Sequence, residues 1–548
     1  MRLADYVAKF LGDLGVSEIF MLSGTGSIYL DDAFAGMEQM SYICARHEAA
    51  AVVMAQAVSK LTGKLGVVVS TTGPGATNAA AGVVEAWVDS VPVLVISGQV
   101  EKTEISDRDR TFGIQGFDVI SHVDSITKYA ATVTDPKRIK YHLEKALYFA
   151  FSGRPGPVWL DIPMDLQAAE INLEQLESFE PPIRNHLDLG SYDEYIDRMI
   201  DMLSKAERPT VVFGQGIRQS GSLDQLKFLL GTLSVPAVSA RMGYDILPYN
   251  HKNYMGMGGY KGQVAPAKII KNSDLIISLG TSHSQSFSFP PQVEVICINI
   301  DEQILAKKNP RISLPIHADL KQILPKLIDR LKKEKFDFAT WLGHCCHIKA
   351  QAEMVKKEYL SNPINSYYLL SRLDELSDSH HIFVNDAGSA NYVSSQILRL
   401  NKGQRELTSG AFYSMGITIP LAIGAAACTP EAQIIAVTGD GSIELNLQEL
   451  QTINLNQLNI KTFVINNGGY ASIRESQDSF CGGRYTDDTE ILDFSKVADL
   501  FNMEFHLVDD YKKIDSKITE VFSTNTPALI EVVCDPNQHI MSPYEEIE

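Results

Sequence analysis

The fold is decided by two stretches of the chain, IIAVTGDGS at residues 434–442 and KTFVINNGG at residues 461–469. Each starts with a run of apolar, β-branched residues and ends in glycine beside an aspartate or asparagine, which is typical of a buried parallel strand followed by a loop. Because the carboxyl ends of parallel strands line the ligand crevice of an open sheet, we expect Asp440 and Asn467 to lie close together. The sequence therefore predicts a polar site at one edge of a parallel sheet.

The residue types at this edge suit a metal-bound diphosphate. A carboxylate and an amide oxygen are ligands that Mg²⁺ prefers, with phosphate and water completing the octahedron. Gly439 and Gly441 let backbone N–H groups approach a phosphate, and a helix that begins after Ser442 would direct its positive end toward it. A Gly-Asp-Gly sequence by itself is more typical of a turn. The second polar cluster, at the end of the next apolar run, favours the metal site.

The same alternation of short apolar runs and helical patterns extends over the rest of the chain. We expect an α/β fold with three parallel-sheet domains, at residues 1–165, 190–335 and 365–548. The polar stretches at residues 165–207 and 317–366 are interpreted as linkers that carry some helix.

Composition excludes several classes of protein. The 548 residues are too many for one small binding module, and 45% hydrophobic with 21% charged residues is ordinary globular composition. The formal net charge of −19 repels phosphate backbones and anionic lipid surfaces, so we expect neither nucleic acid nor a membrane as a partner. The seven cysteines form no C-x-x-C pair, and no apolar run reaches the roughly 18 residues of a membrane span. We therefore expect a cytoplasmic protein with free thiols.

The order of these motifs resembles the thiamine-diphosphate enzyme superfamily, whose signature is GDG followed further along by NN. The chain also looks like the acetolactate synthase branch, and the resemblance covers essentially its whole length. This resemblance is carried by RHEAA at 46–50, TGPG at 72–75 with Asn78, GRPGPV at 153–158 before DIP at 161–163, Met415-Gly416 before Pro420, and QEL at 448–450. It implies a pyrimidine-binding first domain, a Rossmann-like central domain and a third domain that binds the diphosphate and Mg²⁺.

The resemblance implies thiamine diphosphate and Mg²⁺ as cofactors, with the side chains of Asp440 and Asn467 and the carbonyl of Gly469 as metal ligands. Glu48 would hydrogen-bond the aminopyrimidine ring and move the proton that activates the cofactor. A second interpretation is that Glu48 pairs with Arg46 or a surface lysine, since a carboxylate among alanines and valines is costly without a partner.

Further residues are assigned by their position within the resemblance. Met415 matches an apolar wedge that bends the cofactor, although a methionine equally fills a core. Gln115 matches a glutamine that reaches the reacting centre. The implied cofactor contacts are Gly24, Pro74, Asn78, Gly388, Ser389, Ala390, Asn391, Tyr413, Met415, Gly439, Asp440, Gly441, Ser442, Asn467, Gly469 and Tyr470.

The resemblance also implies a homo-oligomer. Glu48 and the GDG and NN motifs lie in different domains, and family members join the first domain of one subunit to the third domain of another. The active site would therefore lie at a subunit interface. A homodimer would be the smallest competent unit, with a homotetramer as a common larger form.

The side chains near the reacting centre favour carboligation over simple decarboxylation. Pyruvate decarboxylases carry adjacent histidines near the position of Gln115, whereas the nearest histidine here is His122. We therefore expect the two-carbon unit of a 2-oxo acid, with pyruvate as the donor, to be added to a second small carbonyl compound.

Two departures from the acetolactate synthases bear on that acceptor. Residues 281–287 read TSHSQSF where those enzymes have an Arg-Phe-Asp-Asp-Arg run, so a flavin contact and the guanidinium that pairs with a carboxylate acceptor are missing. Ser476 stands in place of an acceptor-selecting tryptophan, which leaves room for a bulkier acceptor. These departures favour a keto sugar or another acceptor without a carboxylate. They also count against bound FAD, for which GQG at 214–216 is a weak signal.

Three alternatives stay open. One is a true acetolactate synthase, which converts two pyruvate molecules into 2-acetolactate and CO₂. Another is a non-catalytic paralogue that serves as a scaffold subunit, although the retention of Glu48, Asp440 and Asn467 argues against it. The third is a dehydrogenase built on the central domain, which would bind a nicotinamide cofactor and need no thiamine.

Overall fold

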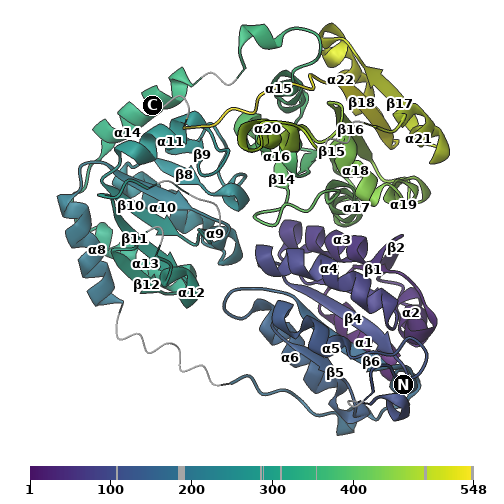
Figure 1. Ribbon diagram of the computed structural model, residues 1–548. Coiled ribbons are helices and arrows are strands. Elements are labelled where there is room, and N and C mark those ends of the chain that lie inside the picture. The colour runs from purple at the N-terminus through teal and green to yellow at the C-terminus, as the bar shows by residue number, and fades with distance from the viewer. Residues whose placement is uncertain are drawn as a thin grey trace.

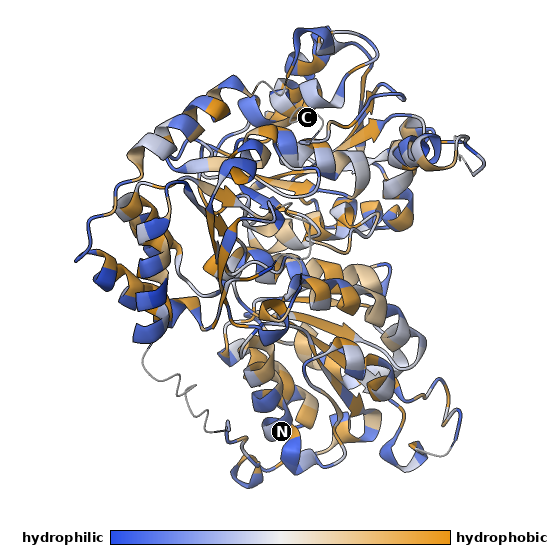
Figure 2. Ribbon diagram, turned by 60° about the vertical axis from the view of Figure 1, so that its left-hand side comes forward, coloured by the Kyte–Doolittle hydropathy of each residue, from blue (hydrophilic) through white to orange (hydrophobic). Residues whose placement is uncertain are grey.

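The computed structural model describes residues 1–106, 109–182, 192–283, 287, 289–308, 311–352, 355–486 and 490–544. Within these residues the chain forms three parallel six-stranded sheets with helices packed on them, which confirms the predicted α/β fold. Figure 1 shows three adjacent units, the first in purple and blue, the central one in teal and the third in green and yellow. Apolar residues concentrate on the strands and on the helix faces that cover them (Figure 2).

The first sheet has the strand order β2-β1-β3-β4-β6-β5. Its strands are β1 (Glu18–Met21), β2 (Ser41–Cys44), β3 (Gly66–Ser70), β4 (Val93–Gln99), β5 (Ala130–Thr132) and β6 (Val158–Pro163). The helices are α1 (Leu3–Asp13), α2 (Ile28–Ala35), α3 (Glu48–Thr62), α4 (Pro74–Asp89), α5 (Val119–Val123), α6 (Ile139–Phe151) and α7 (Met164–Ala168). The strands β3 and β4 are buried along their whole length, which explains the apolar runs at residues 66–69 and 93–96 of the sequence.

The central sheet has the order β12-β11-β10-β7-β8-β9. Its strands are β7 (Pro209–Phe213), β8 (Ala237–Ser239), β9 (Tyr254–Met257), β10 (Leu275–Leu279), β11 (Glu294–Asn299) and β12 (Leu314–His317). The helices are α8 (Asp193–Lys205), α9 (Gly216–Gln219), α10 (Leu223–Leu233), α11 (Val264–Asn272), α12 (Glu302–Leu305), α13 (Leu320–Leu331) and α14 (Ala339–Gln351).

Parts of both stretches interpreted as linkers pack onto this central domain. Helix α8 buries Met199 and Leu203 in the central core, and α14 buries Trp341 and Cys345 against a second apolar cluster of the same domain. The apolar residues of α8 recur on one face of an otherwise charged helix, so the polar average of the stretch conceals a packing surface.

The third sheet has the order β14-β13-β15-β16-β18-β17. Its strands are β13 (His381–Asn385), β14 (Arg405–Leu407), β15 (Gln433–Gly439), β16 (Ile460–Asn466), β17 (Glu504–Val508) and β18 (Ala528–Val533). The helices are α15 (Ser366–Leu376), α16 (Gly388–Ile397), α17 (Thr418–Cys428), α18 (Asp440–Ile443), α19 (Glu449–Leu455), α20 (Ala471–Phe480), α21 (Phe494–Leu500) and α22 (Ile514–Phe522). Because β15 and β16 pair directly, with Gly439 opposite Ile465, their carboxyl ends lie side by side.

The first and third domains share one apolar core. Helices α3 and α17 pack against each other, and a single buried cluster contains Ala55 and Val83 of the first domain with Leu421 and Ile434 of the third. A Cβ on Gly424 would overlap the backbone of the facing helix α3, so only glycine allows this close approach.

All seven cysteines are free thiols, as predicted. Burial raises the pKa of Cys297 to about 11, which is typical of an inert core side chain. Among the helices in the described parts of the chain, none is both long and apolar enough to cross a membrane.

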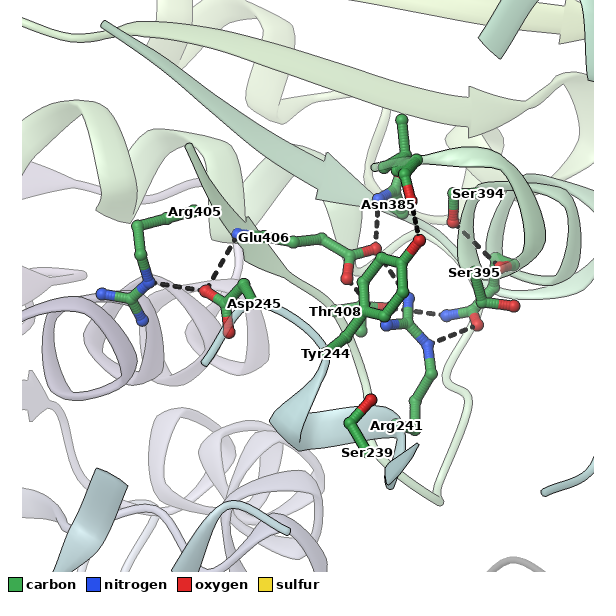
Figure 3. A network of polar contacts seen from close by, with 12 residues as sticks. Ser239, Arg241, Tyr244, Asp245, Asn385, Ser394, Ser395, Arg405, Glu406 and Thr408 are labelled. Atoms are coloured by element: carbon green, nitrogen blue, oxygen red, sulfur yellow. Dashed lines mark hydrogen bonds and ion pairs between the residues drawn. The ribbon is translucent and has the colours of Figure 1, made fainter. Parts of the chain in front are cut away.

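A buried polar network joins the central domain to the third domain (Figure 3). The guanidinium of Arg241 donates to both carboxylate oxygens of Glu406 at 2.7 and 2.8 Å, and the two side chains are 3% and 2% exposed. Nearby, Asp245 accepts from Arg405 at 2.6 Å and from Arg218 at 2.7 Å. Although burial would raise it, Arg218 and Arg405 hold the pKa of Asp245 well below its usual range.

Replacing Arg241 by Met is expected to lower the free energy of unfolding by about 3–5 kcal/mol, because Glu406 would stay buried without its cation. Replacing both Arg241 and Glu406 by Met removes the unpaired charge and should recover most of this loss. Urea unfolding gives the free energy of unfolding of both variants. The more exposed pair of Arg372 and Asp515 is the control, since Arg372→Met should cost less than about 1 kcal/mol. An Arg241→Met variant as stable as the wild type would contradict this account.

Candidate active site

The two strand ends that the sequence singles out meet around Asp440. This residue directly follows β15 and is 2% exposed. Its Oδ2 accepts hydrogen bonds from the backbone N–H groups of Asn467 at 3.0 Å and Gly469 at 2.9 Å, and its Oδ1 accepts from that of Gly441 at 2.8 Å. The structure therefore brings the three residues expected to bind the metal into one cluster.

The electrostatics of this cluster suit a bound cation. Burial raises the pKa of Asp440, and the backbone N–H groups of Gly469, Gly441 and Asn467 oppose that effect. In the described part of the chain no lysine or arginine forms an ion pair with this carboxylate. The carbonyl of Gly469 accepts a hydrogen bond from Ala471 N at 2.8 Å and keeps a second lone pair. Carboxylate, amide and carbonyl oxygens are the donor set of Mg²⁺, so the residues present fit this metal.

Glycines shape the crevice beside the carboxylate. A Cβ on Gly441 would lie 2.6 Å from the ring of Tyr470, so a larger residue does not fit. Gly468 and Gly469 have φ angles of 75° and 100°, which favour glycine. Gly439 leads into the crevice with extended backbone. This arrangement is a backbone cradle of the kind that a diphosphate requires.

Ser442 and Met415 lie on either side of one hydrogen-bonded junction. The hydroxyl of Ser442 donates to Asp386 Oδ1 at 2.7 Å and accepts from the backbone N–H of Gly416 at 2.9 Å. These bonds fix the turn after Met415, whose side chain is 37% exposed and therefore does not fill a core of this chain. Tyr413, two residues earlier, has a φ of 56°, which is uncommon for a residue other than glycine.

The start of α16 divides its residues between surface and interior. Gly388, with a φ of 60°, and Ser389 are half-buried. Ala390 and Asn391 are buried, and Asn391 Oδ1 accepts a hydrogen bond from Arg241 Nε at 3.1 Å. The side chains of Ala390 and Asn391 thus support α16 from inside and, as buried residues, neither presents a side chain to a ligand.

A second cluster forms in the first domain around Glu48. This residue begins α3 and is 6% exposed, and its Oε2 accepts a hydrogen bond from Asn78 Nδ2 at 3.0 Å. A Cβ on Gly75 would lie 3.2 Å from Glu48 Oε1, so the carboxylate lies against the first turn of α4, which begins at Pro74. Within the described residues Glu48 forms no ion pair with Arg46, and its partner is a neutral amide.

Gln115 lies on a loop that packs against the same helix start. It is exposed, with a φ of 65°, and a Cβ on Gly73 would overlap its carbonyl oxygen. Gly24 lies on another loop, where a Cβ would come within 2.5 Å of the side chain of Thr71. Glycine at residue 73 therefore lets the Gln115 loop approach the start of α4, and glycine at residue 24 lets its own loop approach Thr71.

Two polar residues beneath the Gln115 loop have no role predicted from the sequence. Gln99 Nε2 donates to Phe117 O and to Asp161 Oδ2, both at 3.0 Å, and so anchors the loop to the sheet. Burial raises the pKa of Asp161 to about 7, against hydrogen bonds from Ser97, Gln99 and Thr132. In the sequence, Gln99 and Asp161 are recognisable only as polar residues near the carboxyl end of an apolar run.

A cavity of about 300 Å³ lies where the three domains meet. Its lining includes Arg154 of the first domain, His283 of the central domain and Gly410 of the third. Arg154 pairs with Asp301 at 3.0 Å. Burial lowers the pKa of His283 to about 4, so this side chain is neutral near pH 7. Residues 284–286, which complete the departure noted in the sequence, lie outside the described residues.

The chain has three parallel-sheet domains, a buried carboxylate at the end of β15 (Asp440) and another at the start of α3 (Glu48). This is the arrangement of an enzyme that binds thiamine diphosphate. Comparison with family models agrees with this class. The model of the thiamine pyrophosphate enzyme N-terminal TPP binding domain matches residues 1–125, that of the central domain matches residues 196–327, and that of the C-terminal TPP binding domain matches residues 386–532. The chain belongs to the thiamine pyrophosphate enzyme family, as the resemblance predicts.

Within this family the chain is of the acetolactate synthase type. It is 31% identical to the acetolactate synthase large subunit of Lactococcus lactis, over 98% of this chain and 93% of that protein. It is 28% identical to the isozyme 3 large subunit of Escherichia coli, over 98% and 95%. It is 29% identical to the probable acetolactate synthase large subunit of Methanocaldococcus jannaschii, over 98% and 92%. These similarities confirm the prediction of a thiamine-diphosphate-dependent carboligase or decarboxylase.

Proposed function

We propose that the protein releases CO₂ from a 2-oxo acid, with pyruvate as the donor, and adds the remaining two-carbon unit to a carbonyl acceptor that lacks a carboxylate, such as a keto sugar. Family membership supports thiamine-diphosphate-dependent decarboxylation with carboligation in general. The choice of acceptor is specific to this chain, and one observation carries it: the buried arginine of α20 is already bonded to backbone.

The positions of the metal-site residues and of Glu48 suggest the role that each would have in this reaction. Thiamine diphosphate, when bound with Mg²⁺, supplies the nucleophilic carbon that attacks the 2-oxo acid. Asp440, Asn467 and Gly469 would hold the metal and, through it, the diphosphate. Glu48 would take and return a proton at the aminopyrimidine ring, and Asn78 Nδ2 orients its carboxylate.

Helix α20, which begins two residues after Gly469, offers little to a charged acceptor. Arg474 is 4% exposed, and its guanidinium donates to three backbone carbonyls, which it would have to release in order to bind a carboxylate. Ser476 is exposed, and its hydroxyl donates to Ser472 O at 3.0 Å. Because the guanidinium of Arg474 is already bonded and residue 476 is a serine instead of a tryptophan, this face favours an uncharged and bulkier acceptor.

With Mg²⁺ and thiamine diphosphate, the purified protein is expected to consume pyruvate at least about tenfold faster with a keto sugar or aldehyde present than with pyruvate alone. Ser476→Trp should reduce this advantage, because it narrows the space beside the helix, and Ser479→Trp, further along the same exposed face, is the matched control. Mass spectrometry of the products identifies the acceptor to which the two-carbon unit was added. Rapid formation of 2-acetolactate from low concentrations of pyruvate alone would overturn the proposal.

The second candidate is acetolactate synthesis, in which pyruvate is also the acceptor. The names of the relatives favour it, at 28% and 31% identity. It requires that the acceptor carboxylate meet a cation other than Arg474. The product analysis above separates the two candidates.

We also propose that the enzyme works without bound FAD. The resemblance places a flavin in the central domain of some relatives, and that domain lines much of the cavity between the domains. Two arginines line it, Arg154 and Arg241, and they pair with Asp301 and Glu406. The neutral His283 lies in the segment that replaces the Arg and Asp run. Visible flavin absorbance in the preparation used for the pyruvate assay would contradict this part of the proposal.

The active unit that we propose is a homodimer in which Glu48 of one subunit serves the metal cluster of the other. The two clusters lie in different domains, and the hydrogen bonds of Glu48 and Asp440 described above stay within their own domains. Apolar side chains near the metal cluster are exposed in the single chain, with Met415 at 37%, Ile473 at 52% and Leu445 at 54%. Such side chains fit burial by a partner subunit.

A further inference from the structure

Arg474 holds the backbone of the metal loop, which we define as residues 467–469. Its Nη1 donates to Gly468 O at 2.6 Å and its Nη2 to Asn467 O at 2.8 Å. The Gly468–Gly469 peptide is therefore held at both ends, since its carbonyl accepts from Arg474 while its N–H donates to Asp440 Oδ2 at 2.9 Å. In a trans peptide these groups point in opposite directions, so the two side chains fix the orientation of the peptide plane between them.

The metal loop needs such support because its backbone is easily rotated. Gly468 and Gly469 both have positive φ, and glycine populates several other conformations at little cost. Rotation of the peptide plane would turn Gly468 O toward the carboxylate of Asp440 and would take the N–H of Gly469 away from it. The guanidinium of Arg474 stabilises the orientation in which Asp440 stays hydrogen-bonded and ready for a cation.

The same guanidinium also contacts the segment that follows β18. Arg474 Nη2 donates to Pro536 O at 3.3 Å, and the next residue of α20, Glu475, pairs with His539 at 2.7 Å. Beyond this pair, Ile540 O accepts from Lys261 Nζ of the central domain at 3.0 Å. The carboxyl-terminal segment, residues 536–541, is therefore tied to α20 and, through it, to the metal loop.

We infer that Arg474 is a positioning residue that presets the metal loop for Mg²⁺ and thiamine diphosphate and links their binding to the order of the carboxyl-terminal segment. The inference rests on the metal site of the proposed function. Arg474 touches neither metal nor cofactor in this account and acts through the peptide that it holds.

Replacing Arg474 by Gln is expected to weaken the binding of thiamine diphosphate in the presence of Mg²⁺ by about 10–100-fold, the usual effect of losing a group that orients metal ligands. Calorimetric titration of the full-length protein measures the affinity. The cofactor-induced rise in melting temperature should shrink in the same variant, whereas a purely structural role would lower the melting temperature of the cofactor-free protein and leave that rise intact. Arg474→Lys keeps the charge but not the fork, so it should give an intermediate affinity.

The matched control is Arg484→Gln. Arg484 follows the same helix and pairs with Asp478 at 2.6 Å, and the contacts described for it do not involve the metal loop. This variant should bind the cofactor like the wild type. Equal affinity in Arg474→Gln and Arg484→Gln would overturn the inference.

Hydrogen exchange tests the link first in the wild type, where the result does not depend on whether a variant folds. In the wild type, Mg²⁺ with thiamine diphosphate should slow exchange in the metal loop and in the carboxyl-terminal segment together, and Arg474→Gln should retain only the first effect. Cofactor binding that leaves the segment unprotected in the wild type would overturn the inference while leaving the proposed metal site standing. Absence of Mg²⁺-dependent cofactor binding in the wild type would instead show that the metal site itself is misassigned.

Discussion

Replacing Glu48 by Gln is expected to lower kcat for pyruvate consumption by about 10²–10⁴-fold while thiamine diphosphate stays bound. Glutamine has the size of glutamate and can still accept the hydrogen bond from Asn78, but it cannot take up and return a proton. Steady-state turnover gives kcat, and calorimetric titration gives the cofactor affinity.

The matched control for this variant is Glu449→Gln. Glu449 is a second buried carboxylate near the same segment, where its Oε1 accepts the backbone N–H of Arg46 at 2.8 Å, a bond that glutamine can keep. Its turnover should stay close to that of the wild type. If Glu48→Gln kept more than about a tenth of the wild-type kcat, general acid–base catalysis by Glu48 would be ruled out.

The second large effect is expected for Asp440→Asn, which should weaken the binding of thiamine diphosphate in excess Mg²⁺ by at least about 100-fold. The amide offers the metal no negative charge, and its NH₂ group would face the backbone N–H groups that now donate to Asp440. Calorimetric titration measures the loss. Asp535→Asn, just past β18, should bind like the wild type because the carboxylate of Asp535 accepts only the nearby N–H of Asn537 among the contacts described. Unchanged affinity in Asp440→Asn would show that the metal does not bind at Asp440.

These two variants together also test the shared site. If Glu48 of one subunit serves Asp440 of the other, a mixed dimer of Glu48→Gln and Asp440→Asn subunits has one intact site. Random reassociation of equal amounts should then restore about a quarter of the wild-type activity. No recovery after verified subunit exchange would show that Glu48 and Asp440 act within one chain.

The sequence predicts the fold and the metal cluster because both depend on local pattern and on parallel topology. The apolar runs before Gly439 and Asn467 are the observed strands β15 and β16, and their pairing brings Asp440 to the metal loop. Glu48 is equally recognisable, since a carboxylate at the start of an apolar helix needs a reason to be there. The roles of these residues in catalysis remain predictions.

Other features depend on the tertiary path of the backbone, which local pattern does not determine. Arg474 looks like an ordinary exposed helix residue in the sequence, and only the course of residues 467–469 and 536 past its guanidinium reveals what it holds. Asn391 has the residue type of a cofactor ligand, yet its side chain is bonded to Arg241 across a domain junction. Helix α14 reads as linker because its apolar residues are few, although they are well placed for packing.

The close packing of α3 on α17 has a consequence for how the chain folds. Neither cofactor-binding domain closes its own apolar surface, because each completes the interior of the other. The central domain has a separate interior and lies in the chain between the two domains that share one. We expect a fragment that carries only one of these two domains to present a broad apolar surface to water and to aggregate, so the two domains should fold together.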